Sequence, residues 1–184
     1  MRVLIQLLAA FAAGCAAPPG GTRSTARELA RAEALVDAFY SFDPARLRAV
    51  MGSAPESLPR LLYYQAWAEG GNYVVLDRKP CRFDKADDVS CAITVRDDLV
   101  PALGIDFDVT DIFHIGFREG RIVAVRNSSN DPPEFEQALK WVGKQRPALF
   151  DEQCRGFFKD GPTPQACIRE VVKGFREFAA AHPK

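Results

Sequence analysis

The sequence has few of the residues and motifs on which several common functions depend. It contains only two histidines, His114 and His182, and no Cys-x-x-Cys pair, which argues against a zinc site. It also has no glycine-rich phosphate loop, no dinucleotide-binding fingerprint and no Gly-x-Ser-x-Gly motif around a serine nucleophile. We therefore expect the protein to hold no metal ion and no nucleotide or other cofactor.

The sequence also has no excess of positive or of negative charge. Basic and acidic residues number 24 each, and no cluster of lysine and arginine recurs on one face. This balance lacks the basic surface that a nucleic-acid partner requires, so we expect no such partner. The 184 residues, 47% of them hydrophobic, are enough for one domain with a substantial core.

The N-terminal residues have the pattern of an export signal. A short positive start at Met1-Arg2 precedes an apolar run, Val3 to Ala13, that is too short to span a membrane as a mature helix. The segment from Ala12 to Cys15 resembles a bacterial lipobox, in which the signal is cut before a cysteine that then carries lipid. The usual leucine of that motif is replaced here by Ala12. The alternative is an ordinary secretory signal in which the cysteine is incidental.

The resemblance implies a division of the N-terminal region and a location for the protein. Residues 1–14 would be the signal peptide, and residues 15–24 would be a tether that begins at the lipidated Cys15. Ala16, in the next position, is similar to the residue found in lipoproteins of the outer membrane. We therefore expect a protein of the bacterial cell envelope, held by its lipid anchor at the outer membrane and facing the periplasm.

Four cysteines remain once Cys15 is set aside, an even number in a compartment that permits disulfides. Three pairings of the four are possible. We favour the pairing of Cys81 with Cys91, because a hairpin turn between them would place them opposite each other. Cys154 and Cys167 would then form the second disulfide. Each loop of this size should add about 2 to 3 kcal/mol to the free energy of unfolding.

Helices are predicted where apolar residues recur at helical spacing behind a capping signal. The predicted helices begin at Thr25, at Asp43-Pro44, at Ser57, at Asp131-Pro132 and at Thr163-Pro164. The third should end at Gly70-Gly71, where glycine favours termination. The segment from Arg146 to Pro162 has no such pattern and is expected to be mostly loop.

The middle of the chain has a period of two, which is typical of strands. Its longest such stretch runs from Ile105 to Asn127, and the odd positions from Ile105 to Phe117 are all apolar except Asp111. Shorter strands are expected before it, from Tyr73 onward, whereas Leu99 to Gly104 contains Pro101 and is expected to be a loop or bulge. The sequence therefore predicts an α+β domain in which N-terminal helices pack on a curved antiparallel sheet.

Two segments within this pattern resemble a known superfamily. They are the helix from Tyr63 to Trp67 and the strand-turn-strand from Asp111 to Val123, and they resemble the nuclear transport factor 2-like superfamily, which includes SnoaL-like cyclases and ketosteroid isomerases. The resemblance implies a cone-shaped fold that encloses a pocket, often in a homodimer. On this basis residues 25–145 form the domain, and residues 146–184 form a C-terminal extension with a helix and a disulfide.

Asp111 is the candidate catalytic residue, because a carboxylate in an apolar row is costly to ionise and its pKa should rise. A raised pKa suits a general acid or base, and ketosteroid isomerase-like pockets use carboxylates in this way. The alternative is structural: Asp111 would pair with Arg126 or with a tyrosine hydroxyl. His114 lies on the opposite strand face by parity, so we do not expect it to act with Asp111.

Five further residues are candidates for contact with a ligand: Tyr63, Tyr64, Trp67, Phe113 and Arg126. Aromatic side chains can line a pocket and, through a hydroxyl, orient what it binds, although on a helix they also form plain core. An arginine can anchor an anion. No motif decides between these roles.

Three functions are consistent with these patterns. The first is binding of a small apolar ligand or a partner protein in a cone-shaped pocket, without catalysis. The second is a SnoaL-like or isomerase-like enzyme in which Asp111 moves a proton. The third uses the C-terminal helix, with Phe175 and Phe178, as a docking surface for another envelope protein.

Overall fold

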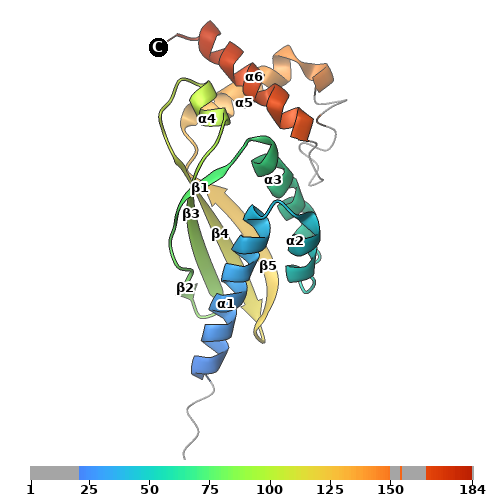
Figure 1. Ribbon diagram of the computed structural model, residues 1–184, viewed down its shortest axis with the longest axis vertical. Helices are drawn as coiled ribbons and strands as arrows, with labels where there is room; N and C mark the ends of the chain where they lie inside the picture. Colours follow the sequence, from blue (N-terminus) through green and yellow to red (C-terminus); the bar gives the residue numbers. More distant parts are fainter. Residues whose placement is uncertain (1–20, 150–153, 155–164, 184) are drawn as a thin grey trace, which may run out of the picture.

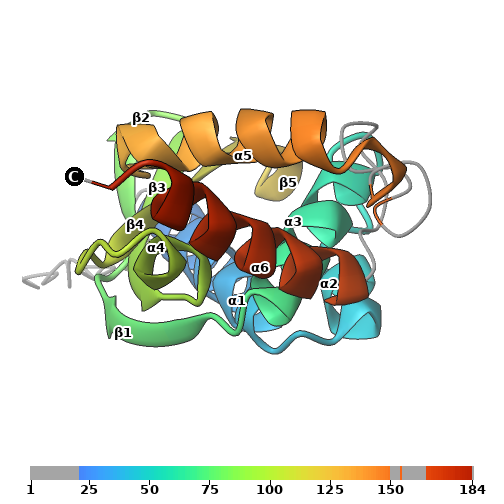
Figure 2. The same cartoon turned by 90° about the horizontal axis from the view of Figure 1, so that it is seen from above.

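The computed structural model describes residues 21–149, Cys154 and residues 165–183. It confirms an α+β architecture built on an open five-stranded antiparallel sheet. One helix lies along a face of the sheet, and two more continue beside it (Figure 1). The last two helices lie together across one end of the molecule (Figure 2).

The sheet is formed by the middle of the chain, as the period of two predicted. Its strands are β1 (Val74–Arg78), β2 (Arg82–Lys85), β3 (Asp88–Arg96), β4 (Val109–Arg118) and β5 (Arg121–Ser129). Their order is β1-β3-β4-β5, and β2 also pairs with β3. All the pairs are antiparallel, so β3 and β4 are the central strands.

The apolar row of β4 faces the helices. Val109, Phe113, Ile115 and Phe117 are buried, whereas the residues between them are only partly buried. The strand is shorter than predicted, because Ile105 to Asp108 form no strand and the pairing with β3 begins at Val109. Phe107 is accordingly left 38% exposed, so an apolar residue in the right phase did not extend the sheet.

The edge of the sheet beside β3 is made of two short strands in succession. β1 pairs with β3 up to Arg78 and β2 pairs with it from Arg82, so the edge is broken around Pro80. Proline has no amide hydrogen to donate to a ladder, which suits it to such a break. Cys81 and Cys91 then lie opposite each other, with their Cα atoms 4.3 Å apart, and form the predicted disulfide.

Three helices cover one face of the sheet: α1 (Gly21–Tyr40), α2 (Pro44–Val50) and α3 (Leu58–Gly70). Asp43 caps α2 as predicted, with its carboxylate accepting hydrogen bonds from the next backbone amides. α1 begins at Gly21, four residues before the predicted start, so the end of the predicted tether is helical. Once a helix is nucleated each added residue gains a hydrogen bond, so it can extend past a capping signal.

The remaining three helices lie together at one end of the sheet (Figure 1): α4 (Leu99–Ala102), α5 (Pro133–Gln145) and α6 (Gln165–Ala181). The segment from Leu99 was expected to be a loop or bulge and is instead a short helix. Asp97 explains this, because its carboxylate accepts hydrogen bonds from the amides of Leu99 and Val100, at 2.7 and 2.8 Å, and so caps the turn.

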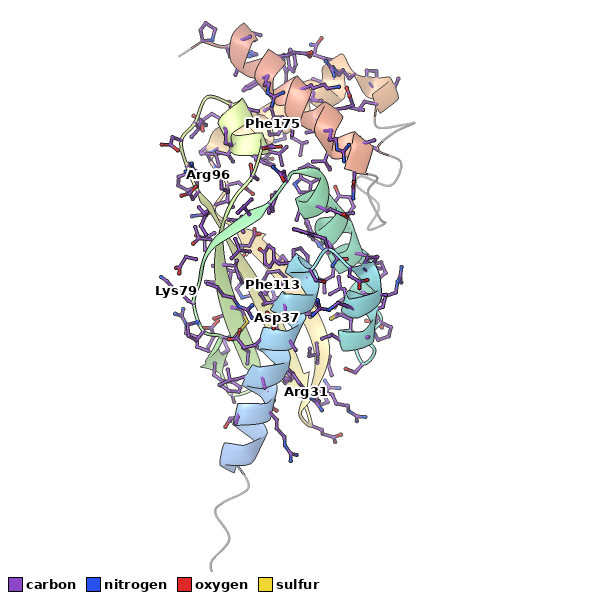
Figure 3. All side chains as sticks on the ribbon, in the orientation of Figure 1. Arg31, Asp37, Lys79, Arg96, Phe113 and Phe175 are labelled. Atoms are coloured by element: carbon purple, nitrogen blue, oxygen red, sulfur yellow. A yellow bond between two sulfur atoms is a disulfide. The ribbon has the colours of Figure 1, made fainter. Side chains whose placement is uncertain are left out.

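Two hydrophobic cores result from this arrangement. The first lies between the sheet and α1 to α3, and Phe113 is fully buried in it. The second lies among α3 to α6, and Phe175 is fully buried in it against Phe135. Figure 3 shows the two phenylalanines at separate levels of the molecule. Phe175 is therefore not available as the docking surface considered from the sequence.

The second predicted disulfide is also confirmed, because Cys154 and Cys167 are bonded and buried in the second core. The proposed signal peptide, Cys15, most of the tether and residues 150–153 and 155–162 of the expected loop lie outside the described residues, as does the start signal Thr163-Pro164. None of the helices in the described ranges is both long enough and apolar enough to cross a membrane.

Candidate functional site

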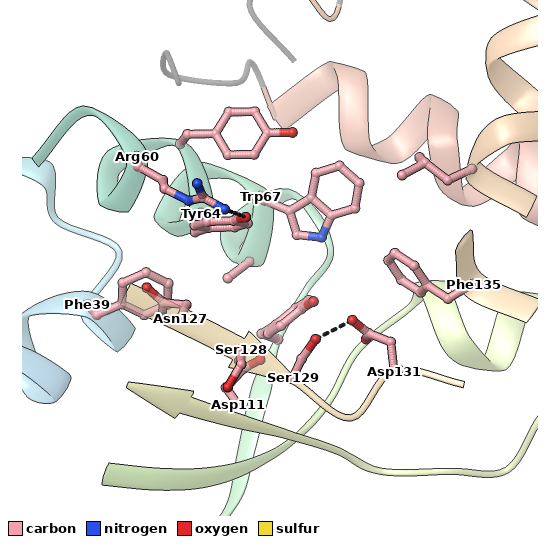
Figure 4. Close-up of a pocket in the computed structure, with 14 residues that line it drawn as sticks. Phe39, Arg60, Tyr64, Trp67, Asp111, Asn127, Ser128, Ser129, Asp131 and Phe135 are labelled. Carbon is pink, nitrogen blue, oxygen red and sulfur yellow. Dashed lines mark hydrogen bonds between the residues drawn. The ribbon is translucent and has the colours of Figure 1, made fainter. Parts of the chain in front are cut away.

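A cavity of about 550 Å³ lies where the two cores meet. Tyr64, Tyr73 and Phe135 pack against both cores, and all three line the cavity. Figure 4 shows its walls. The lining residues come from α1, α3, the sheet and α5, and they are Phe39, Arg60, Tyr63, Tyr64, Trp67, Ala68, Tyr73, Asp111, Asn127, Ser128, Ser129, Asp131, Phe135 and Leu139.

One wall of the cavity is aromatic and comes mainly from α3. Tyr63, Tyr64 and Trp67 are close together, with the ring centres of Tyr63 and Tyr64 5.3 Å apart in an edge-to-face arrangement. Trp67 also approaches Phe135, at the start of α5, with 6.3 Å between ring centres. α3 is apolar around most of its circumference because it serves both cores: Leu61 faces the first and Trp67 the second.

The facing wall is polar and contains Asp111. This residue lies on the inward face of β4, directly opposite Ser129 of β5. Its carboxylate accepts a hydrogen bond of 2.8 Å from the hydroxyl of Tyr40, at the end of α1. Burial raises the pKa of Asp111 to about 6, although the hydrogen bond from Tyr40 opposes the shift, and the negative charges of Asp131 and Asp97 add to it.

Two more carboxylates lie near this wall. Asp131, just after β5, lines the cavity and accepts a hydrogen bond from Ser129, and burial raises its pKa. Asp97 is 4% exposed, and burial raises its pKa to about 6. Tyr73 senses all three carboxylates: burial and then the charges of Asp97, Asp111 and Asp131 raise the pKa of its hydroxyl. Each of these acids, when ionised, therefore adds negative charge to this region.

Arg60 is the cation among the lining residues, and it lies on the aromatic side. Its guanidinium donates a hydrogen bond of 3.1 Å to the hydroxyl of Tyr64 and lies 5.4 Å from the centre of that ring. Figure 4 shows Arg60 beside Tyr64 and apart from Asp131. The Arg60 side chain is exposed at the cavity's edge.

The structure brings together four of the six predicted site residues: Asp111, Tyr63, Tyr64 and Trp67 all line the cavity. Phe113 does not line it, because it is fully buried beneath it, edge-on to Phe39. Arg126 pairs with His114 across the sheet and is exposed on the face opposite to Asp111. Of the two structural partners proposed for Asp111, the structure shows a tyrosine hydroxyl, that of Tyr40.

Sequence reasoning missed Tyr40, Tyr73, Asp131 and Phe135. Tyr40 and Phe135 lie at the apolar spacing of two predicted helices and so gave no separate signal, and Asp131 was assigned to a helix start. A signal was present for Asp131, because Ser128 to Asp131 continue β5 past its last buried residue with polar side chains only. When the last residues of a core strand are all polar, that end of the strand lies outside the core. Here it lies at the cavity.

Among the described residues, no group of three or more histidine, cysteine or acidic side chains gathers closely enough to hold a metal ion. The carboxylates of the cavity region are thus too far apart to bind one metal ion together. Comparison of the chain with protein-family models, with curated proteins and with solved structures finds no match. The arguments on function below therefore depend on the site itself.

Proposed function

We propose that this protein is a lipid-anchored protein of the bacterial cell envelope whose nuclear transport factor 2-like domain binds a small, largely apolar ligand. The observation that supports binding is the cavity of about 550 Å³ between the two cores, with an aromatic wall facing a polar one. Its volume is in the range of small-molecule pockets, and aromatic walls with a few placed polar groups are typical of them.

Binding without chemistry is the simpler use of this cavity. A proton-transfer enzyme needs an acid or base, a partner that stabilises the charge that develops and a group that orients both. Asp111 has one described hydrogen-bond partner, Tyr40, which also belongs to the packed cluster of aromatic rings around Phe113. Tyr40 therefore serves the core, whereas Tyr63, Tyr64 and Trp67 of α3 line the cavity.

A fluorescent apolar probe tests the binding proposal. N-phenyl-1-naphthylamine is uncharged at neutral pH and brightens when it leaves water, so the purified protein should enhance its fluorescence in a saturable manner. Ser129→Trp should abolish the enhancement, because Ser129 is exposed within the cavity and a bulky ring there fills the space. Ala124→Trp is the matched control, since Ala124 is exposed on the same strand but outside the cavity.

The outcomes of this experiment separate the cavity from other apolar surfaces. Equal enhancement by the wild type and Ser129→Trp would mean that the probe binds elsewhere, and the proposal would fail. Loss of enhancement in both tryptophan variants would indicate a damaged sheet. Circular dichroism of each variant settles that point, because an intact protein retains the spectrum of the wild type.

A second candidate function is favoured by the raised pKa of Asp111. A carboxyl group with a pKa of about 6 at the wall of an aromatic cavity can take a proton from a carbon acid and return it to a neighbouring carbon, an isomerisation that needs no further reactant. Asp111→Asn should then abolish turnover of a bound compound and keep its affinity. Unchanged turnover in this variant would exclude Asp111 as the base.

The lipid anchor is tested separately from the cavity. Cells grown with a labelled fatty acid should incorporate it into the wild-type protein, and Cys15→Ser should remove both the label and the association with the membrane fraction. A protein that remains unlabelled but is exported would support the alternative of an ordinary secretory signal. Neither result changes what the cavity binds.

A further inference from the structure

We infer that the ligand of this cavity is an organic cation, an amine or quaternary ammonium group on an apolar body, held between the aromatic rings of α3 and the carboxylates of Asp111 and Asp131. This inference rests on the proposed function, since it names the class of ligand that the cavity would bind. It is drawn from the arrangement of the two walls and from the distribution of charge around them.

The aromatic wall suits a cation. The face of an aromatic ring carries partial negative charge, and a quaternary ammonium group is attracted to it most strongly when water is excluded. Tyr63, Tyr64, Trp67, Tyr73 and Phe135 all contribute to the cavity lining, and Tyr63 and Trp67 are at most 9% exposed. A cation between such rings would therefore be largely desolvated, the condition in which this attraction is greatest.

The opposite wall supplies negative charge that no ion pair among the described residues balances. The described ion pairs of the chain do not include Asp97, Asp111 or Asp131. Asp106 and Asp108, on the surface, are by contrast both paired with Arg96. The hydrogen bonds that Asp111 and Asp131 accept come from neutral hydroxyls, those of Tyr40 and Ser129. Asp111 and Asp131 are partly buried, where an unbalanced carboxylate is more costly than in water, and a bound cation would reduce that cost.

The arrangement favours an organic cation over a metal ion or an anion. The described acidic side chains do not gather within reach of one metal ion, so the negative charge is spread along a wall of the cavity. A bulky cation matches a spread charge. An anion would be repelled by Asp111 and Asp131, and Arg60, which lies at the edge, is already engaged by Tyr64.

Three matched probes test the inference on the purified protein by calorimetric titration. They are trimethyl(2-phenylethyl)ammonium, its uncharged carbon analogue 3,3-dimethylbutylbenzene, and the anion 3-phenylpropanoate. We expect the cation to bind at least about tenfold more tightly than the uncharged analogue, as a desolvated cation–aromatic contact and a carboxylate partner predict, and the anion to bind most weakly. Ser129→Trp should abolish binding of the cation.

Charge-removing variants make the test specific. Asp111→Asn and Asp131→Asn should each weaken binding of the cation by about tenfold or more and change binding of uncharged N-phenyl-1-naphthylamine by less than about twofold. Asp106→Asn is the control, because Asp106 is exposed, paired with Arg96 and outside the cavity. Folding does not confound the result, since the uncharged probe reports the intact cavity in the same sample.

Each outcome decides the inference. Equal affinity for the cation and its uncharged analogue, or tighter binding of the anion, would overturn it while saturable binding of N-phenyl-1-naphthylamine left the proposed function standing. If none of the probes bound, both would fail. A preference for the cation that persisted in both asparagine variants would also overturn it, because the carboxylates would then not be its partners.

Discussion

The two cores of this molecule are built by different means. The first is held by a sheet in which each strand of the β3 to β5 meander pairs along most of its length, and apolar residues alternate with polar ones. The second contains no strand in the described chain and is made by helices that touch at a few points of close approach. A cavity of about 550 Å³ remains where these two kinds of packing meet.

α3 connects the two cores and so determines whether they are independent. Its residues alternate between them, with Leu61 and Leu62 in the first and Tyr63 and Trp67 in the second. A helix that serves both cannot leave one without disturbing the other. We therefore expect the described domain to unfold as one cooperative unit despite its two kinds of packing.

The largest expected effect comes from removing one phenylalanine from each core. Phe113→Ala and Phe175→Ala should each lower the free energy of unfolding by about 3 to 5 kcal/mol, because both side chains are fully buried. Urea unfolding followed by far-ultraviolet circular dichroism and by tryptophan fluorescence measures the change. Both tryptophans, Trp67 and Trp141, lie in or against the second core, so the two signals report different parts.

Coincident transitions in both variants would support one cooperative unit. If Phe175→Ala moved only the fluorescence transition, the cores would be independent and the role assigned to α3 would be wrong. Phe107→Ala is the matched control. Phe107 is 38% exposed, and its loss should change the free energy of unfolding by less than about 1 kcal/mol.

Removing the disulfides should have the next largest effect. Cys81–Cys91 and Cys154–Cys167 span 10 and 13 residues, and loops of this length correspond to about 3 kcal/mol each in the chain-entropy picture. Paired changes to alanine, compared by urea unfolding, measure both. The bond in the second core should matter more, because β2 and β3 already hold Cys81 near Cys91 by strand pairing. A larger loss for the first pair would reverse this ranking.

The sequence predicted the first core better than the second for a physical reason. Alternation in β4 depends on which face of one strand is buried, and it is visible within the strand itself. The second core depends on which helices approach, and no local pattern states that Gly174 lies against Val142 or that Gly70 lies against Ile168. α5 and α6 contact each other through Phe135 and Phe175, which lie 40 residues apart in the sequence.

The residues of the candidate site likewise fall into those that a local sequence pattern reveals and those that only the folded structure reveals. Asp111 was found because it interrupts a local pattern, and Tyr63, Tyr64 and Trp67 were found because aromatic residues gather on one helix. Arg126 was placed with Asp111 although strand parity assigns it to the other face, beside His114. Asp131 and Tyr73 were missed because only the junction between the two cores brings them to the cavity.

Close helix approach in the second core predicts a smaller but specific effect. A Cβ atom on Gly174 would lie 2.5 Å from a methyl carbon of Val142, so Gly174→Ala should lower the free energy of unfolding by about 1 to 3 kcal/mol. Gly116→Ala in β4 is the control from the first core. Its Cβ atom would meet Asp88 at an ordinary 3.6 Å, and we expect a change within about 0.5 kcal/mol.

A double variant sharpens this test. Val142→Ala removes the methyl groups that the new Cβ atom would meet, so the loss caused by Gly174→Ala should be smaller in the Val142→Ala background. Strict additivity of the two losses, measured by urea unfolding, would show that the helices approach each other differently from this structure.

The smallest expected effect concerns Asp111, which lies where the two cores meet. Burial raises its pKa to about 6 when folded, from about 3.9 for an exposed aspartate, so between these pH values the folded protein holds a proton that the unfolded chain has released. The free energy of unfolding should therefore fall as the pH rises through this window and stay level above it. Asp97, with a pKa of about 6, contributes a fall in the same window.

Asp111→Asn should remove the part of this fall that Asp111 causes, about 1 to 2 kcal/mol, because an amide does not titrate and still accepts the Tyr40 hydrogen bond. Urea unfolding at pH 4, 5, 6 and 7 gives the two curves, with Asp106→Asn as an exposed control. Identical curves for the wild type and Asp111→Asn would mean that folding leaves the pKa of Asp111 at its ordinary value of about 3.9. The carboxylate would then be stabilised as well as it is in water, and the cavity would lose the unbalanced charge that selects its ligand.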